Sequence, residues 1–198
     1  MRPRRRRAAG ALFVATADAR PGKTPVHHPS PTTVVRPLTP SDAAAYVALR
    51  RAMLLDTPRA FAADPETDRG SDEAGVRTSL ADPGYAIIGA FEDEALIGAA
   101  GVIRQGGRKL RHRAYIWGVW VRPDRRGRGI GEALVRGTIE AAREWPDLRV
   151  LCLSANAEQP AAIRLYERVG FKAWGVEPSM LIVDGVEYDE VHMQLRVR

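Results

Sequence analysis

The chain contains a single cysteine, Cys152, and only four histidines among its 198 residues. One cysteine excludes an intrachain disulfide and is typical of a reducing compartment. Two of the histidines, His27 and His28, lie near the N-terminus and the others are scattered, so no metal site is predicted. No run of 18 apolar residues exists, which argues against a transmembrane helix. These absences favour a cytoplasmic protein without a metal or a membrane partner.

The net charge of +6 is unevenly distributed along the chain. Residues 1–30 carry seven basic side chains against Asp18 alone and account for all of this excess, whereas residues 31–198 hold 23 basic and 23 acidic residues. The sequence therefore predicts a basic N-terminal extension, 1–30, and one domain, 31–198. Because the domain is formally neutral, its charge gives no reason to expect nucleic acid as a partner.

Three interpretations of the extension stay open. It is a disordered, solvated segment, or the product of a start codon placed too far upstream. It also has the order of a short secretory signal: a basic stretch at 4–7, an apolar stretch at 8–17 and a cleavage-like triplet at 17–19. The third interpretation is an arm that binds polyanions such as nucleic acid.

Hydrophobic patterning in the domain predicts strands that alternate with helices. We expect helices near residues 40–54, 71–80, 130–145 and 158–169. We expect strands at 32–36, 85–91, 95–104, 148–154, 171–183 and 186–197, and one that ends at Val121. This order predicts the α/β class: a mixed sheet of about seven strands with helices on both faces.

The most informative segment is Arg126–Gly131, which follows an apolar strand and opens an amphipathic helix. Unpaired backbone N–H groups at such a helix start, close approach permitted by glycine, and arginine charge together suit a phosphate or pyrophosphate group. The dinucleotide fingerprint G-x-G-x-x-G fails because Leu134 stands where its third glycine would be, and no Walker loop is present. What remains is the pattern R-x-x-G-x-G.

A second segment runs from the strand ending at Asn156 through a helix with Leu165-Tyr166-Glu167 to Gly170-Phe171. With the glycine turn upstream, this order resembles the GNAT superfamily of N-acetyltransferases over about residues 33–197. In that fold, the strands ending at Val121 and near Asn156 splay apart and acetyl-CoA lies in the gap. The resemblance thus implies the GNAT fold and acetyl-CoA as the cosubstrate.

The resemblance also assigns roles to residues. The turn would hold the pyrophosphate, the strand edge before it would pair with the pantetheine arm, and Asn156 would hydrogen-bond that arm. Tyr166 would be the general acid that protonates the departing thiolate. The cofactor-binding set is Val119, Trp120, Val121, Arg126, Gly127, Arg128, Gly129, Ile130, Gly131, Asn156 and Tyr166. Core packing or turn formation alone is the alternative for each of these side chains.

No general base stands out, because the strand before the turn has no carboxylate. The remaining candidates are Glu177, Asp189, Glu190, His112 and His192, and a chain of water molecules is the alternative. Transfer is expected to be direct rather than through Cys152, since buried thiols are usually inert.

The acceptor is expected near the first helices and the last hairpin. Pocket walls are expected from Leu54, Phe61, Trp117 and Tyr188, although each also suits a plain core role. The segments Leu49–Phe61 and Arg113–Gly118 resemble a bacterial subgroup loosely called YhhY-like.

The leading functional prediction is an N-acetyltransferase acting on a primary amine of a small molecule or amino-acid derivative. A protein or peptide Nα-acetyltransferase is the enzymatic alternative, and a non-catalytic acyl-CoA-binding module is the alternative outside enzymes. A homodimer is compatible with the family resemblance. The sequence leaves the acceptor open because specificity depends on pocket shape rather than on a readable motif.

Overall fold

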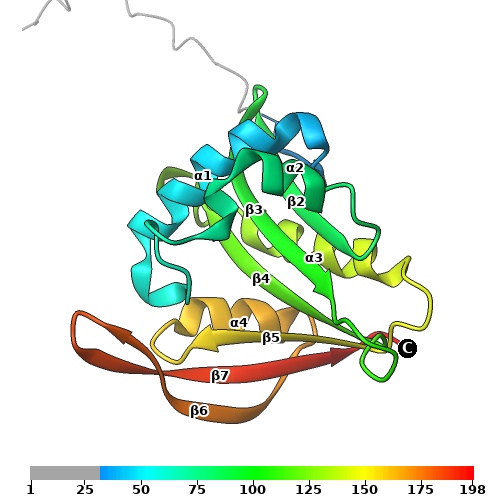
Figure 1. Ribbon diagram of the computed structural model, residues 1–198. Helices are drawn as coiled ribbons and strands as arrows, with labels where there is room; N and C mark the ends of the chain where they lie inside the picture. Colours follow the sequence, from blue (N-terminus) through cyan, green and yellow to red (C-terminus); the bar gives the residue numbers. More distant parts are fainter. Residues whose placement is uncertain (1–31) are drawn as a thin grey trace, which may run out of the picture. The chain divides into compact units, whose positions relative to one another are not determined.

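Seven strands form one mixed sheet in residues 32–198, the part of the chain that the computed structural model describes (Figure 1). Their order across the sheet is β1-β2-β3-β4-β5-β7-β6, and only β4 and β5 run parallel. The predicted basic extension, 1–30, lies outside the described residues. The strands are β1 Val34–Pro37, β2 Tyr85–Glu92, β3 Ala95–Arg104, β4 Arg113–Val121, β5 Val150–Asn156, β6 Lys172–Val183 and β7 Val186–Arg196.

Helices cover both faces of this sheet, as the sequence predicts. They are α1 Ala43–Asp56, α2 Glu73–Ser79, α3 Ile130–Arg143 and α4 Pro160–Arg168. In Figure 1, α1 and α2 lie in front of β2 to β4, and α3 lies behind them. One group of buried side chains joins α1 and α2 to the sheet, and two others join α3 and α4 to its opposite face. The predicted α/β architecture is confirmed. Within residues 32–198, no helix combines the length and apolar composition needed to cross a bilayer.

Local chemistry explains where the helices begin. Thr39 caps a 3-10 turn, Pro40–Asp42, that leads directly into α1, and Pro160 opens α4, where the missing N–H costs nothing. The predicted helices at 130–145 and 158–169 are correct in place but slightly long. Helix α3 has a strongly amphipathic pattern, with Ile130, Leu134 and Thr138 buried as predicted.

The parallel pair of β4 and β5 is short. Only three residue pairs match across it, from Arg113 with Val150 to Tyr115 with Cys152. Beyond Tyr115, β4 continues for six residues without a β5 partner. The pairing of β3 with β4 shifts register between Ala99 and Gly101, and Gly118 has a positive φ of 63° at this place. A bulge bends and twists a strand, which helps β4 to leave β5.

Candidate functional site

An opening lies where β4 and β5 separate. It is a cleft of about 580 Å³. One wall is the free part of β4, another is the end of β5 with α4, and the glycine turn closes one end. Most of the predicted cofactor-binding residues meet here: Val119, Trp120, Val121, Arg126, Gly127, Gly129, Ile130, Gly131, Asn156 and Tyr166.

The glycine turn presents backbone rather than side chains to the cleft. Gly127 and Gly129 have φ angles of 77° and 79°, and a Cβ at either would meet no atom within 4 Å. Gly129 is the N-cap of α3 and offers no side-chain cap, so the N–H groups of Ile130, Gly131 and Glu132 lack an intrahelical partner. These donors and the helix dipole make this end of the cleft suitable for an anion.

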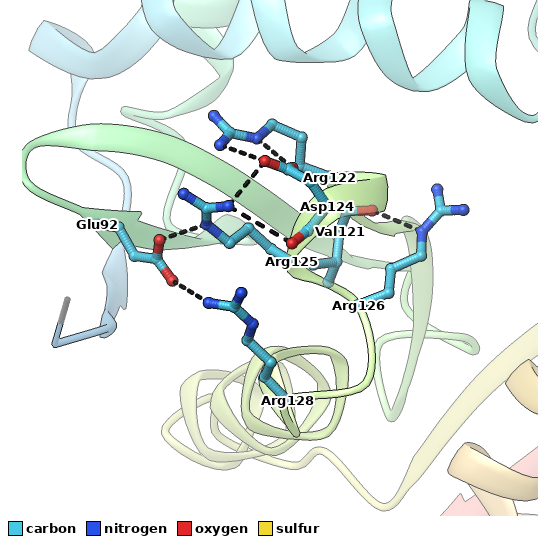
Figure 2. Close-up of polar contacts among 7 residues, drawn as sticks. All are labelled: Glu92, Val121, Arg122, Asp124, Arg125, Arg126 and Arg128. Atoms are coloured by element: carbon cyan, nitrogen blue, oxygen red, sulfur yellow. Dashed lines mark hydrogen bonds and ion pairs between the residues drawn. The ribbon is translucent and has the colours of Figure 1, made fainter. Parts of the chain in front are cut away.

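Acidic partners hold the arginines around the turn (Figure 2). The Arg125 Nε donates to Glu92 at 2.5 Å, and an Arg128 nitrogen lies 3.9 Å from the other oxygen of Glu92. Arg126 turns to the opposite side, where its Nε donates to the Val121 carbonyl at 2.9 Å. Arg128 is exposed and does not line the cleft, so its place in the predicted set depends on side-chain movement.

Asp56, at the end of α1, joins that helix to the cleft. Its carboxylate accepts a hydrogen bond from the Trp120 indole at 2.9 Å and also contacts Arg126. Desolvation opposes ionisation, but hydrogen bonds from Thr57, Trp120 and Arg126 outweigh it and lower the pKa of Asp56. The sequence offered no sign of this link, because it joins residues 64 and 70 positions apart.

Tyr166 projects from α4 into the cleft and is 7% exposed. Its ring packs edge-on against Phe171, with 6.2 Å between centroids. Burial, with a smaller contribution from Tyr115, raises the pKa of Tyr166 above its ordinary value. The phenol therefore keeps its proton at neutral pH and remains a hydrogen-bond donor.

Asn156 lines the cleft, but both ends of its amide are engaged. The amide nitrogen donates to the Arg59 carbonyl at 2.8 Å, and the amide oxygen accepts from the Glu158 N–H at 2.8 Å. Asn156 thus links the segment after α1 to the end of β5. This is the turn-forming role that the sequence left open as the alternative to cofactor binding. A bond to a cofactor arm requires an exchange of one of these partners.

The four expected acceptor-pocket residues divide into two pairs. Phe61 and Trp117 line the cleft. Leu54 is 2% exposed within α1, and Tyr188 is 5% exposed with the Arg59 guanidinium 5.1 Å above its ring. Neither Leu54 nor Tyr188 lines the cleft, because both side chains are buried in contacts with other parts of the domain.

None of the five candidate bases lines the cleft. His192 and Glu177 pair with each other at 2.7 Å, and the Asp189 carboxylate accepts the Ser179 N–H at 2.9 Å. Glu190 is buried in β7 opposite Asn156, and His112 lies before β4. Removal of the acceptor's proton by water therefore stays the simpler expectation.

Cys152 does not line the cleft. An Arg113 nitrogen donates to its sulfur at 2.9 Å, and burial raises the pKa of the thiol although Arg113 opposes that shift. A thiol that holds its proton is a poor nucleophile. In residues 32–198, no three His, Cys, Asp or Glu side chains are grouped to hold a metal ion.

A second cavity, of about 530 Å³, was not foreseen from the sequence. It lies on the α1 and α2 side of the sheet, and Trp117 belongs to its wall and to the wall of the cleft. Three charged residues line it: Arg50 and Asp68, which form a buried ion pair, and Asp72. Helical spacing gave one usable signal: Arg50 follows Tyr46 by four residues, on the buried face of α1.

The sequence matches a family model described as the acetyltransferase (GNAT) family over residues 48–171. It is 32% identical over 114 residues to the N-alpha-acetyltransferase RimI of Mycobacterium tuberculosis, which is 58% of this chain and 69% of that protein. It is 35% identical over 79 residues to an L-methionine sulfoximine/L-methionine sulfone acetyltransferase of Pseudomonas aeruginosa. That match covers 40% of this chain and 45% of the relative, less than half its length.

The fold also resembles solved structures. The structure of yncA from Salmonella typhimurium with its cofactor acetyl-CoA matches with a TM-score of 0.74 and 22% identity. The match covers 84% of this chain and 94% of that one. At this identity, the similarity supports the fold of the sheet and its helices.

Proposed function

Because the chain belongs to the GNAT acetyltransferase family and is thus an acetyltransferase, we propose that it transfers the acetyl group of acetyl-CoA directly to a primary amine of a small molecule or amino-acid derivative. The observation that carries this proposal is the cleft between β4 and β5, which ends at the unpaired N–H groups of α3. The YhhY-like subgroup stays a prediction.

The two ends of the cleft suit the two ends of the cosubstrate. The pyrophosphate belongs at the glycine turn, where backbone donors and the α3 dipole favour negative charge. The pantetheine arm belongs along the free edge of β4, from Val119 to Val121, where backbone groups have no β5 partner. Its thioester then lies towards Trp117 and Tyr166, which line the same cleft.

In the proposed reaction, the neutral acceptor amine attacks the thioester carbonyl carbon. A C–N bond forms, the C–S bond breaks, and the sulfur leaves with the electron pair. Backbone N–H groups of β4 polarise the carbonyl, and Tyr166 gives its phenol proton to the departing sulfur. The acceptor nitrogen loses its proton to water, from which Tyr166 regains its own.

Two measurements test this proposal. Calorimetric titration with coenzyme A should show binding that weakens when Arg126 is reversed to Glu. Release of free thiol from acetyl-CoA should then be measured with a panel of amino acids, polyamines, aminoglycosides and peptides. Absence of coenzyme A binding, or binding with no thiol release from any amine, would overturn the proposal.

A second candidate is Nα-acetylation of a peptide or protein, which the 32% identity to RimI favours. The same panel separates the two: peptides as the best acceptors would favour the second candidate, and free amines the first. Any thioester-dependent acetyl transfer would exclude a non-catalytic acyl-CoA-binding module.

A further inference from the structure

The second cavity contains one charged donor that is only partly used. Arg50 donates two hydrogen bonds to Asp68. Its Nε donates to one carboxylate oxygen at 3.0 Å, and a terminal nitrogen donates to the other at 3.1 Å. Its remaining terminal nitrogen, Nη1, has the Met53 sulfur at 3.4 Å as its partner. A thioether is a weak acceptor, so this buried cation keeps capacity for a stronger one.

Two phenols add donors to the same cavity. Tyr46 and Tyr85 line it, and among the residues whose side chains the structure describes neither hydroxyl has a hydrogen-bond partner. Tyr46 is 2% exposed, and Tyr85 is half-buried. Burial raises the pKa of Tyr85 to about 12 and that of Tyr46 further, although Arg50 opposes both shifts, so both remain protonated.

The carboxylates that line this cavity are already engaged. Asp68 is bound by Arg50, and Asp72 accepts the N–H groups of Ala74 and Gly75 at 3.1 and 3.0 Å. The hydrogen-bond capacity left on Arg50, Tyr46 and Tyr85 consists of donors, and an anion would accept from them. These three donors suit a carboxylate.

The cavity also adjoins the place where transfer would occur. The Arg50 Nη1 lies 3.4 Å from the point where a Cβ of Gly118 would stand, and Gly118 lines the cleft. The Arg50 guanidinium lies 5.8 and 5.6 Å from the ring centres of Phe61 and Trp117, which also line the cleft. The Arg50 guanidinium thus lies beside three residues that line the cleft.

We propose that the second cavity binds the carboxylate of the acceptor, so that the substrate class is a free α-amino acid or a close derivative rather than a peptide or a polyamine. This inference rests on the proposed function. The carboxylate would bind Arg50 with Tyr46 and Tyr85, while the amine passes Trp117 and Gly118 to reach the thioester.

The test compares acceptors that carry a carboxylate or a carboxamide, with rates expressed per neutral amine because the carboxamide lowers the pKa of the neighbouring amine. Thiol release is measured with the proteinogenic L-amino acids and L-methionine sulfone, each beside its α-carboxamide. We expect the carboxylate form to have a kcat/KM about tenfold higher or more, since hydrogen bonds to charged groups are worth that much. The preference should reside in KM.

Variants assign the preference to this cavity. Replacing Arg50 alone would leave Asp68 buried without its partner, so the informative variant is Arg50→Met combined with Asp68→Asn. It should lose the preference for the carboxylate, and Tyr85→Phe should lose part of it. The matched control is Arg143→Met, which removes an exposed arginine on α3. Coenzyme A affinity by calorimetry and the melting temperature report whether each variant is folded.

The outcomes separate the two proposals. Equal rates for acid and amide, or a preference that survives in the folded double variant, would overturn the carboxylate site and leave acetyl transfer intact. Coenzyme A binding without thiol release from any acceptor would overturn both.

Discussion

Tyr166 is the residue on which the proposed chemistry places the largest demand. Tyr166→Phe removes one oxygen from the cleft and leaves the ring in contact with Phe171. We expect kcat to fall tenfold or more because the departing sulfur loses its proton donor. Coenzyme A affinity should stay nearly constant in calorimetry. An unchanged kcat in the thiol-release assay would remove the role assigned to this phenol.

Gly127 provides a second test at the scale of single residues. Gly127→Ala adds a methyl group in open space, so its cost comes from the positive φ, about 1 kcal/mol. Relief of that strain would reorient the backbone at the turn, and we expect weaker binding of coenzyme A in calorimetry.

Gly185→Ala is the matched control for this change. Gly185 has the same φ of 77° with the same open surroundings, but it lies in the turn between β6 and β7. It should lower the melting temperature by a similar amount and leave coenzyme A affinity unchanged. Equal affinity losses in both variants would indicate general destabilisation instead.

The sequence indicated the residues around the glycine turn better than those of the second cavity. The glycine spacing and the helix pattern predicted the backbone donors because both signals lie within a few consecutive positions. Arg50 and Asp68 are 18 positions apart, and no local pattern pairs them. Leu54 and Tyr188 were expected as pocket walls because they are large side chains near the first helices and the last hairpin, a criterion that does not distinguish a wall from a core.

At the scale of elements, Asp42 fixes the entry to α1 against β1. Arg36 donates to both of its carboxylate oxygens at 2.8 Å, and the Thr39 N–H donates at 2.7 Å. We expect Asp42→Asn to lower the free energy of unfolding by about 1–3 kcal/mol, because it breaks the bidentate pair and weakens the cap. Urea denaturation at neutral pH measures the difference.

The difference in the free energy of unfolding between wild type and Asp42→Asn depends on pH in a definite direction. Hydrogen bonds from Arg36 hold the pKa of Asp42 below its usual range, against a smaller opposing effect of burial. Its contribution is therefore present above the unfolded pKa of about 3.9 and is lost as the pH falls below it. The difference in the free energy of unfolding between wild type and Asp42→Asn should therefore become smaller in acid.

Asp147→Asn serves as the comparison, since Asp147 pairs with Arg111 on an exposed surface. Its effect should stay below about 1 kcal/mol at every pH. A loss as large as that of Asp42→Asn would contradict the importance given to the α1 entry.

Helices and strands were predictable where the hydrophobic period agrees with the Pro and Gly residues that mark the ends of elements. Pro40, Pro146 and the Asp184-Gly185 turn mark ends that the structure places within a few residues of expectation. The separation of β4 from β5 has no such local mark. It came from the family resemblance, and physically it follows from a register shift and the positive φ of Gly118, which a sequence does not display.

At the scale of the whole chain, the charge asymmetry leads to a test. All of the net charge belongs to residues 1–30, so we expect their deletion to abolish any salt-sensitive retention on DNA. Coenzyme A binding and the melting temperature should be preserved, because the described core is built from residues 32–198. DNA retention that survives the deletion would assign it to the domain instead.

The free edge of β4 also has a consequence for self-association. Exposed strand edges invite other polypeptides to add to a sheet, and proteins usually protect them. Here the free edge lies in the cleft, whose walls include β5, α4 and the glycine turn. We therefore expect the side chains of an incoming strand to meet these walls, and a narrower chain that carries amides but no amino-acid side chains to enter more easily. The cleft thus protects this strand edge from pairing with other polypeptides and selects ligands by their width.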